Sequence, residues 1–580
     1  MNAASVDGRR AWWLALAGAV TMFLVQPPAD LWPLAWLAPL PWLLLIRQGM
    51  GATPHPWRLL WCAGFLHWLL AIHWLRLPHP ATSIGWVALS AYLAIYTPLF
   101  IWTTRRMVAR WRWPLVVAAP VCWMGLEHAR GSILGGFTLG ALGHTQWRFT
   151  TLIQCADSFG AEGVGGVVML VAAALATLVA GHGAGQPGSS TPGPTGGTAE
   201  GSRRREQIVA LVVAGGVLGL VLLYGSWRLA EAPGPVEQPL EVLLVQGSID
   251  TELKHDPGAA GAVLRHYDDL TTAALDQGSR PDLIVWPETM WRYGLLEIAP
   301  EEVLPAEIVE QTLGPVEAGD DESSRQARCR RALAQERLDL LAAYARRYGT
   351  HWLVGLDRQV VSPNVPGGMQ NFNTALFLDP IGRPLGRYDK IYPVMFGEYV
   401  PLAEQYPWLY RLTPLPGGLT AGKTPVAERV AGYWLAPTIC YETTLPGAVR
   451  EVVRTLQKQG TRPDVLVNLT NDGWFWGSSE LDMHLASAIF RAVEVRTPIV
   501  IAANTGLSAS IDGCGRLLAQ GPRRATATLS VQVSPDGRQS PWLTWGSVPT
   551  GGCLAIVLGV LAEGIGGRLR ARRSLSGPAR

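Results

Sequence analysis

The sequence predicts two parts of different character, an α-helical transmembrane domain with about eight spans and a polar domain built as an α/β or α/β/α sandwich. The composition is low in charge for a soluble protein, since 48% of the 580 residues are hydrophobic, 16% are charged and 25 are Trp. Long apolar runs are gathered before residue 230. From about 238 to 540, short apolar runs alternate with helical stretches.

The N-terminal membrane domain is expected to cover residues 1–230 with about seven spans. Each apolar run is close to the ~20 residues that cross a hydrocarbon core, although the second and fifth runs are short and contain prolines. The glycine-rich segment 130–160 is either a re-entrant segment or an ordinary outer loop, and 182–206 is expected to be a flexible linker. The expected spans are 11–27, 31–47, 57–75, 84–103, 114–129, 161–181 and 207–229.

Arginine placement predicts the orientation of these spans. With the N-terminus inside, most arginines of the domain fall in inside segments, and the outside loops hold little more than Arg76, Arg130 and Arg148. Seven spans from an inside start place 238–540 outside, which is periplasmic in a bacterium. An eighth span at 549–566 then returns the chain to a basic cytoplasmic tail at 567–580. If the second or fifth span fails, the large domain changes side.

The polar domain at 238–540 alternates strand-like and helix-like segments, which is typical of an α/β or α/β/α sandwich. The acidic stretch 296–328 is expected to be an insertion or a mobile loop. The expected strands are 240–246, 283–286, 351–356, 373–378, 435–440, 465–470 and 498–504. The expected helices are 259–276, 330–348, 444–459 and 481–497.

Three strand ends in this domain carry ionisable side chains. Glu288 follows one strand, Lys390 follows the strand at 373–378 and its turn, and Cys440 ends the run at 435–440. A carboxylate can take a thiol proton and a lysine can stabilise an oxyanion, so the three suffice for acyl transfer through a thioester. Each also has an ordinary alternative, as a helix start, a solvated loop residue and a core thiol. Spacing in the sequence leaves these alternatives open.

Four motifs in order resemble the Glu-Lys-Cys signatures of the nitrilase superfamily. They are Trp286-Pro-Glu288, Lys390 with Phe396-Gly-Glu-Tyr-Val-Pro401, Ile439-Cys-Tyr-Glu442 and Asn471-Asp-Gly-Trp-Phe475. With seven spans before and one after, nearly the whole chain resembles the apolipoprotein N-acyltransferases, the membrane members of that superfamily. The resemblance implies a sandwich of nitrilase (carbon-nitrogen hydrolase) type. The chain departs from the family pattern at His255, Met395 and Trp476.

The resemblance also implies roles for particular residues. Glu288 would be the general base, Cys440 the nucleophile and Lys390 the oxyanion-stabilising cation. Glu398 would orient Lys390 or relay a proton, and Tyr441 and Glu442 would also be required. Further residues in matching segments are expected to give structural support ahead of direct chemistry: Asn373, Asn471, Asp472, His484, Arg491, Glu494 and Asn504.

The implied reaction is N-acylation of the S-diacylglyceryl cysteine of apolipoproteins, with phospholipid as acyl donor and a cysteine thioester as intermediate. The implied protein is a monomer of the bacterial inner membrane, with both termini cytoplasmic and no cofactor. The alternatives are a membrane-tethered nitrilase-type amidase acting on a small soluble substrate and a transporter or receptor with an inactive sensor domain. Scattered cysteines without CxxC pairs argue against a metal site, and a net charge of +3 argues against nucleic acid.

Overall fold

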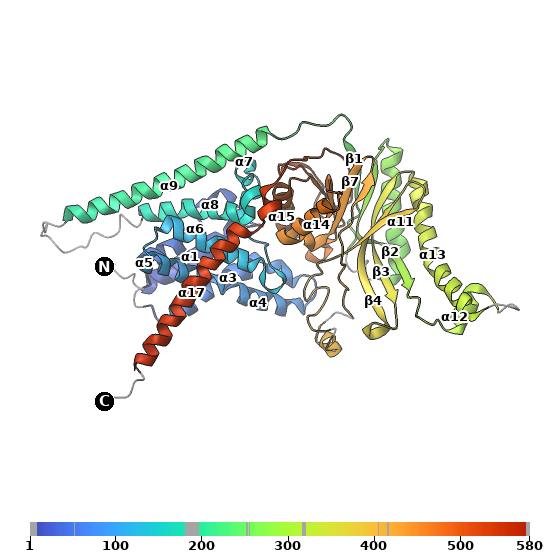
Figure 1. Ribbon diagram of the computed structural model, residues 1–580, viewed down its shortest axis with the longest axis horizontal. Helices are drawn as coiled ribbons and strands as arrows, with labels where there is room; N and C mark the ends of the chain where they lie inside the picture. The colour runs from blue at the N-terminus through green and yellow to red at the C-terminus, as the bar shows by residue number, and fades with distance from the viewer. Residues whose placement is uncertain are drawn as a thin grey trace. The chain divides into compact units, whose positions relative to one another are not determined.

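The computed structural model describes residues 8–50, 53–179, 196–250, 253, 256–315, 321–403, 405–413 and 417–575. The chain divides into two compact units, Met1–Ala232 with Ser540–Arg580, and Pro233–Gln539, whose elements are labelled in Figure 1. Lys254, His255 and most of the expected linker at 182–206 lie outside the described residues. The last residues of that linker belong to a helix, α9 (Gly196–Ala230).

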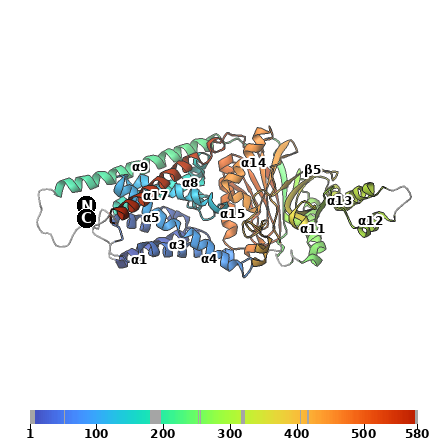
Figure 2. The same cartoon turned by 60° about the horizontal axis from the view of Figure 1, so that its bottom comes forward.

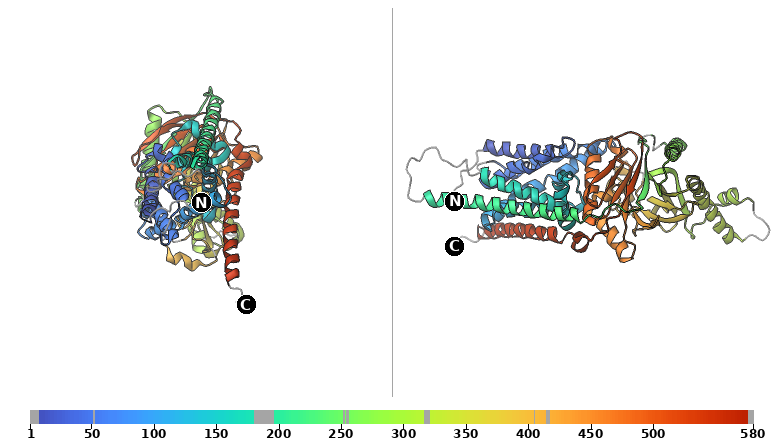
Figure 3. Two further views of the ribbon diagram at one scale, coloured as in Figure 1. Left: turned by 90° about the vertical axis from the view of Figure 1, so that its left-hand side faces the viewer. Right: turned by 90° about the horizontal axis from the view of Figure 1, so that it is seen from above.

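The first unit is helical. Apolar side chains from most of its helices share one core. Helix α9 packs along α8 (Ala156–Val179), and α17 (Val548–Leu575) packs along α6 (Leu115–Arg130). Figure 3 draws α9 in green and α17 in red. Its other helices are α1 (Gly8–Leu24), α2 (Leu40–Gln48), α3 (Pro56–Ala71), α4 (Thr82–Leu93), α5 (Tyr96–Arg110), α6 (Leu115–Arg130), α7 (Thr150–Ile153), α8 (Ala156–Val179), α16 (Pro541–Trp545) and α17 (Val548–Leu575).

Four helical segments among the described residues are long and apolar enough to cross a membrane: Thr82–Arg110, Ala156–Val179, Gly201–Ala230 and Val548–Gly567. The expected spans 11–27, 57–75 and 114–129 correspond to the shorter helices α1, α3 and α6, which have 17, 16 and 16 residues. The expected second span is divided into a 3₁₀ turn at Trp32–Trp36 and the nine-residue α2. Prolines there remove the backbone N–H groups that a continuous helix needs. The total of eight spans therefore stays a prediction.

The second unit contains two six-stranded sheets, ordered β12-β1-β2-β3-β4-β5 and β11-β10-β9-β8-β7-β6. In each sheet three central strands run parallel and the outer strands pair antiparallel. The first sheet comprises β12 (Ala527–Val533), β1 (Leu240–Gln246), β2 (Leu283–Ile298), β3 (His351–Val361), β4 (Met369–Leu378) and β5 (Pro384–Asp389). The second comprises β11 (Leu517–Gln520), β10 (Ala509–Ile511), β9 (Ile499–Ala503), β8 (Val465–Thr470), β7 (Tyr433–Ile439) and β6 (Glu428–Val430).

The two sheets stack face to face between two layers of helices. Leu244 and Phe377 of the first sheet share a buried core with Ile439 and Val467 of the second. Helices α11 (Ala260–Asp276) and α13 (Glu322–Tyr348) pack on the outer face of the first sheet. Helices α14 (Pro446–Lys458) and α15 (Glu480–Val495) lie along the second sheet, as Figure 2 shows. The sandwich thus has two sheets between its helix layers.

The stretch 296–328 is more regular than the sequence indicated. Strand β2 continues to Ile298, α12 occupies Ala306–Leu313, and α13 begins at Glu322, eight residues before the expected helix start at 330. The Asp321 side chain accepts a hydrogen bond from the backbone N–H of Ser324 (2.9 Å), which caps α13. The expectation of a mobile loop is therefore wrong for most of this stretch, and the alternative of an insertion stays a prediction. Residues 316–320 lie outside the described residues.

Candidate active site

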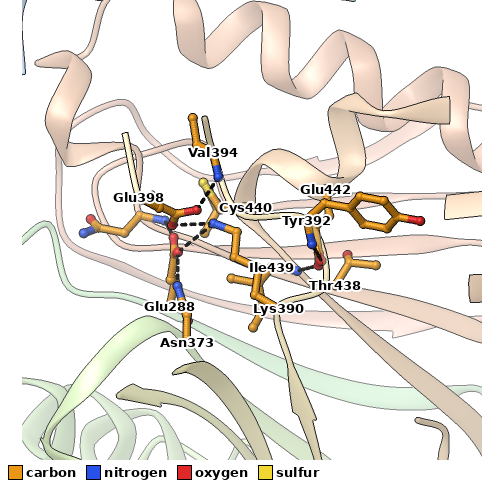
Figure 4. Close-up of polar contacts among 12 residues, drawn as sticks. Glu288, Asn373, Lys390, Tyr392, Val394, Glu398, Thr438, Ile439, Cys440 and Glu442 are labelled. Atoms are coloured by element: carbon orange, nitrogen blue, oxygen red, sulfur yellow. Dashed lines mark hydrogen bonds and ion pairs between the residues drawn. The ribbon is translucent and has the colours of Figure 1, made fainter. Parts of the chain in front are cut away.

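The first sheet positions Glu288 and Lys390, and the second sheet positions Cys440. Glu288 lies in β2 where the pairing register with β3 shifts, between Trp286 and Trp291. Lys390 directly follows β5, and Cys440 directly follows β7. Because these two sheets face each other, ionisable groups far apart in the sequence meet between the layers. Figure 4 shows the Cys440 thiol beside Lys390 and the carboxylates of Glu288 and Glu398.

Two hydrogen-bond donors and one cation hold the Glu288 carboxylate, which is 6% exposed. Asn373 Nδ2 donates to Oε1 (2.6 Å), and the backbone N–H of Asn471 donates to Oε2 (2.9 Å). Lys390 Nζ lies 3.5 Å from Oε1. Asn504 Nδ2 in turn donates to Asn471 Oδ1 (2.9 Å), which ties this network to the end of β9. The base candidate therefore has one fixed position, as proton transfer at a defined atom requires.

Lys390 is a buried cation, 1% exposed, between two carboxylates. Its Nζ donates to Glu398 Oε1 (2.6 Å), while Glu398 Oε2 accepts from the backbone N–H of Val394 (2.7 Å). Burial alone would lower the pKa of Lys390, but the charges of Glu398 and Glu288 outweigh it, so that its pKa lies above the ordinary value. Lys390 therefore stays charged and can face a developing oxyanion.

Cys440 combines a strained backbone with a partly buried side chain. Its φ of +51° lies in the left-handed region, which costs a non-glycine residue ~1–3 kcal/mol and needs support from its surroundings. Burial and the Glu288 charge raise the pKa of the thiol well above its ordinary value, against the opposing effect of Lys390. The resting thiol is neutral, so it must lose its proton to a base before it can act as a nucleophile.

Glu442 joins the end of β7 to the segment after Lys390. Its Oε1 accepts from the Tyr388 hydroxyl (2.8 Å) and from the backbone N–H groups of Ile391 (2.7 Å) and Tyr392 (3.0 Å). Its Oε2 accepts from the backbone N–H of Ile439 (2.7 Å). The buried Glu442 carboxylate thus fixes the backbone before Cys440 relative to the backbone after Lys390.

Replacing Glu442 by Gln is expected to lower the free energy of unfolding by about 3 kcal/mol, because the amide NH₂ must face at least one buried backbone N–H. Guanidinium unfolding of the full-length protein in detergent measures the change. The matched control is Glu451→Gln, an exposed position on α14, which is expected to leave stability unchanged. Equal stability of the two variants would contradict the bridging role of Glu442.

Tyr441, the remaining predicted residue, follows the nucleophile directly. Its carbonyl accepts from Thr444 Oγ1 (2.7 Å), and burial raises the pKa of its phenol to about 12, so the hydroxyl stays protonated. Three residues expected mainly as support contact the candidate catalytic residues, since Asn373 and Asn471 bond to Glu288 and His484 bonds to the Cys440 carbonyl. Asn471 has a signal in the sequence, because it directly follows the apolar strand β8. Asn373 lies inside β4 and His484 lies in α15, so neither has that signal.

A buried group of acidic and histidine side chains near Cys440 could hold a cation. Ligand atoms of Asp472, Glu480 and His484 all lie within 4.8 Å of one another. Burial and the nearby Asp472 charge raise the pKa of Glu480 to about 8, so this carboxyl is largely protonated at neutral pH. Both nitrogens of His484 already contact protein oxygens, Asp472 Oδ1 and the Cys440 carbonyl. The absence of a metal remains a prediction.

Comparison with known proteins adds two family matches and several full-length relatives. Residues 17–174 match the model described as "Apolipoprotein N-acyltransferase N-terminal domain", and residues 244–540 match "Carbon-nitrogen hydrolase". A protein named apolipoprotein N-acyltransferase from Geobacter metallireducens is 30% identical over 565 residues, covering 94% of each chain. A protein of the same name from Rhodopirellula baltica is 28% identical, covering 93% of this chain and 95% of its own. An amidase structure from Nesterenkonia sp. is 19% identical with a TM-score of 0.33, covering 52% of this chain and 94% of its own.

Proposed function

Because the chain belongs to the apolipoprotein N-acyltransferase family, we propose that it moves an acyl chain from a membrane phospholipid to the N-terminal amine of a diacylglyceryl apolipoprotein. The observation that carries this proposal is the cluster of Glu398 and the buried Glu288 and Lys390 beside Cys440, in a chain that matches both domains of the family. We place the protein in the bacterial inner membrane with the second unit periplasmic and both termini cytoplasmic.

The first half-reaction forms a thioester. Glu288 takes the proton of the Cys440 thiol, and the thiolate attacks the carbonyl carbon of the sn-1 ester of the phospholipid. Lys390 and a backbone N–H near Cys440 stabilise the oxyanion of the tetrahedral intermediate. The intermediate collapses by breaking its bond to the glycerol oxygen. That oxygen receives the proton from Glu288 and leaves as lysophospholipid, while the acyl chain stays on Cys440.

The second half-reaction makes an amide. The α-amine of the S-diacylglyceryl cysteine attacks the thioester carbonyl, and Glu288 takes a proton from the attacking nitrogen. The same donors stabilise the second oxyanion. The carbon–sulfur bond then breaks, the Cys440 thiolate regains a proton from Glu288, and the N-acylated lipoprotein leaves. No step needs a metal or an organic cofactor.

The apolar helices of the first unit are consistent with this pair of substrates. Both the phospholipid and the diacylglyceryl protein are anchored in the bilayer by their own acyl chains. A chain with transmembrane helices stays in the same membrane as both. A nitrilase-type amidase with a small soluble substrate would gain nothing from such helices.

The test is an assay of the full-length protein in detergent with a phospholipid that carries a labelled sn-1 chain and a synthetic peptide that begins with S-diacylglyceryl cysteine. The expected product is the labelled peptide with an amide at its α-amine, identified by mass spectrometry, together with lysophospholipid. Turnover of a small amide without lipid, and no acylated peptide, would instead support the amidase alternative.

A further inference from the structure

The carbonyl oxygen of Cys440 accepts hydrogen bonds from three buried side chains. Thr443 Oγ1 lies at 3.1 Å, His484 Nε2 at 3.2 Å and Asn468 Nδ2 at 3.3 Å. A carbonyl oxygen has two lone pairs, so three donors saturate it. The donors come from three separate elements, the 3₁₀ turn Cys440–Thr444, helix α15 and strand β8. The peptide plane after the nucleophile is therefore fixed from several directions.

The two ring nitrogens of His484 have different partners. Nε2 lies 2.8 Å from Thr443 Oγ1 and 3.2 Å from the Cys440 carbonyl oxygen. The Thr443 hydroxyl donates its own hydrogen to that carbonyl, which can only accept, so Nε2 carries a hydrogen that both oxygens can share. Nδ1 faces Asp472 Oδ1 at 3.3 Å, and this oxygen also accepts from Thr470 Oγ1 (2.8 Å). Asp472 thus orients the imidazole ring toward the nucleophile turn.

Holding this carbonyl also fixes the next N–H group. The peptide bond between Cys440 and Tyr441 is planar and trans, so its N–H points opposite to its carbonyl. The left-handed φ of Cys440 shows that the turn keeps a strained conformation, which persists only where neighbouring groups enforce it. An N–H directly after a nucleophile is a frequent oxyanion donor in acyl-transfer sites. The direction of the Tyr441 N–H therefore matters for the reaction.

We propose that His484, oriented by Asp472, is a positioning residue that holds the Cys440 carbonyl and thereby aims the Tyr441 N–H at the oxyanion. Lys390 then meets the same oxyanion from the opposite sheet. The inference rests on the proposed function in one respect, that Cys440 is the acylated nucleophile. It does not depend on which lipid donates the acyl chain.

The experiment compares two reactions of Cys440 in the full-length protein in detergent. Acylation by p-nitrophenyl butyrate passes through an oxyanion, whereas alkylation by iodoacetamide does not. His484→Ala is expected to lower the acylation rate at saturating ester about tenfold to a hundredfold, with KM and the alkylation rate little changed. His484→Gln, whose Nε2 can reach the carbonyl, is expected to restore most of the rate.

The matched control is Ser487→Ala on the same helix. The buried Ser487 hydroxyl donates to the Met483 carbonyl one turn earlier (2.9 Å), and its removal is expected to leave both rates unchanged.

A second variant keeps the test valid if His484→Ala does not fold. His484→Phe keeps a ring of similar size at this position but has no donor for the Cys440 carbonyl, so the same split between acylation and alkylation is expected. Equal losses of both rates, or unchanged acylation in both variants, would overturn the proposal. The proposal would also be overturned if the purified protein held one metal ion per chain and lost its acylation activity when that ion was chelated. Acylation by the nitrophenyl ester without any acylation by phospholipid would overturn the proposed donor and leave this inference standing.

Discussion

Replacing Cys440 by Ala or Ser is expected to abolish formation of an acyl-enzyme from labelled phospholipid, with a loss of about 10⁴-fold or more. Alanine has no nucleophile, and a serine hydroxyl is far harder to deprotonate than a thiol. The fold should persist, because the side chain changes little in volume. The measurement follows label on the protein after incubation of the membrane-inserted variant with sn-1-labelled phospholipid.

The other six cysteines supply the control for this prediction. Replacing residues 62, 122, 155, 329, 514 and 553 together is expected to leave labelling intact, because the proposed mechanism uses none of them. Label that persists on the Cys440→Ala variant would refute Cys440 as the nucleophile. Loss of label in the sixfold variant, with Cys440 still present, would point to a different nucleophile or to a structural thiol.

Glu288→Gln is expected to lower the rate of acyl-enzyme formation by about 10²–10⁴-fold, the usual contribution of a general base. The amide keeps the length of the side chain and can still accept from Asn373, but it cannot take the thiol proton. Stopped-flow measurement of the first half-reaction separates this effect from release of the product. Because the raised pKa of the Cys440 thiol keeps it neutral at rest, the loss should appear in the rate of acylation.

Glu398→Gln is the matched control for the base, since Glu398 also contacts Lys390 (2.6 Å) but is not assigned the proton transfer from the thiol. A loss of about tenfold is expected from it, through a less well-oriented lysine. A larger loss in Glu398→Gln than in Glu288→Gln would transfer the role of base to Glu398. Wild-type rates in both variants would remove carboxylate catalysis from the mechanism.

The candidate site residues could be chosen from the sequence because each one follows an apolar run or the turn after it. In the structure Lys390 and Cys440 directly follow strands, whereas Glu288 lies inside β2, which continues to Ile298. Apolar runs with clear boundaries indicated β2, β7 and β8, and polar residues that directly follow such strands tend to share one edge. Lys390 was harder to place. The strand that leads to it, β5, has the partly exposed sequence Pro384–Asp389, which shows no apolar run.

The contacts between the layers could not be predicted from the sequence. Asn373 is 85 residues from Glu288, and His484 is 44 residues from Cys440, so their hydrogen bonds depend on register and on the stacking of two sheets. Hydrophobic periodicity reports which face of a strand is buried but not what covers it. For the same reason the sequence predicted most of the strands but not their division into two stacked sheets.

The spans show a different limit of hydrophobic patterns. Runs such as 31–47 and 114–129 are apolar enough to suggest crossings, yet prolines divide the first of them and the helix in the second has 16 residues. In the stretch 296–328, acidic composition suggested a loop, but an Asp321 cap and a small core of Leu304, Val309 and Cys329 stabilise helices there. Local capping and packing outweighed composition in that segment.

The most direct test of the proposed mechanism is mass spectrometry of the full-length protein after incubation with a phospholipid of two different, defined acyl chains and no acceptor. The mechanism predicts a mass increase equal to the sn-1 acyl group, located on the peptide that contains Cys440 and released by neutral hydroxylamine as a thioester is. An adduct on another residue, an adduct that resists hydroxylamine, or no adduct while the peptide acceptor is still acylated would contradict it.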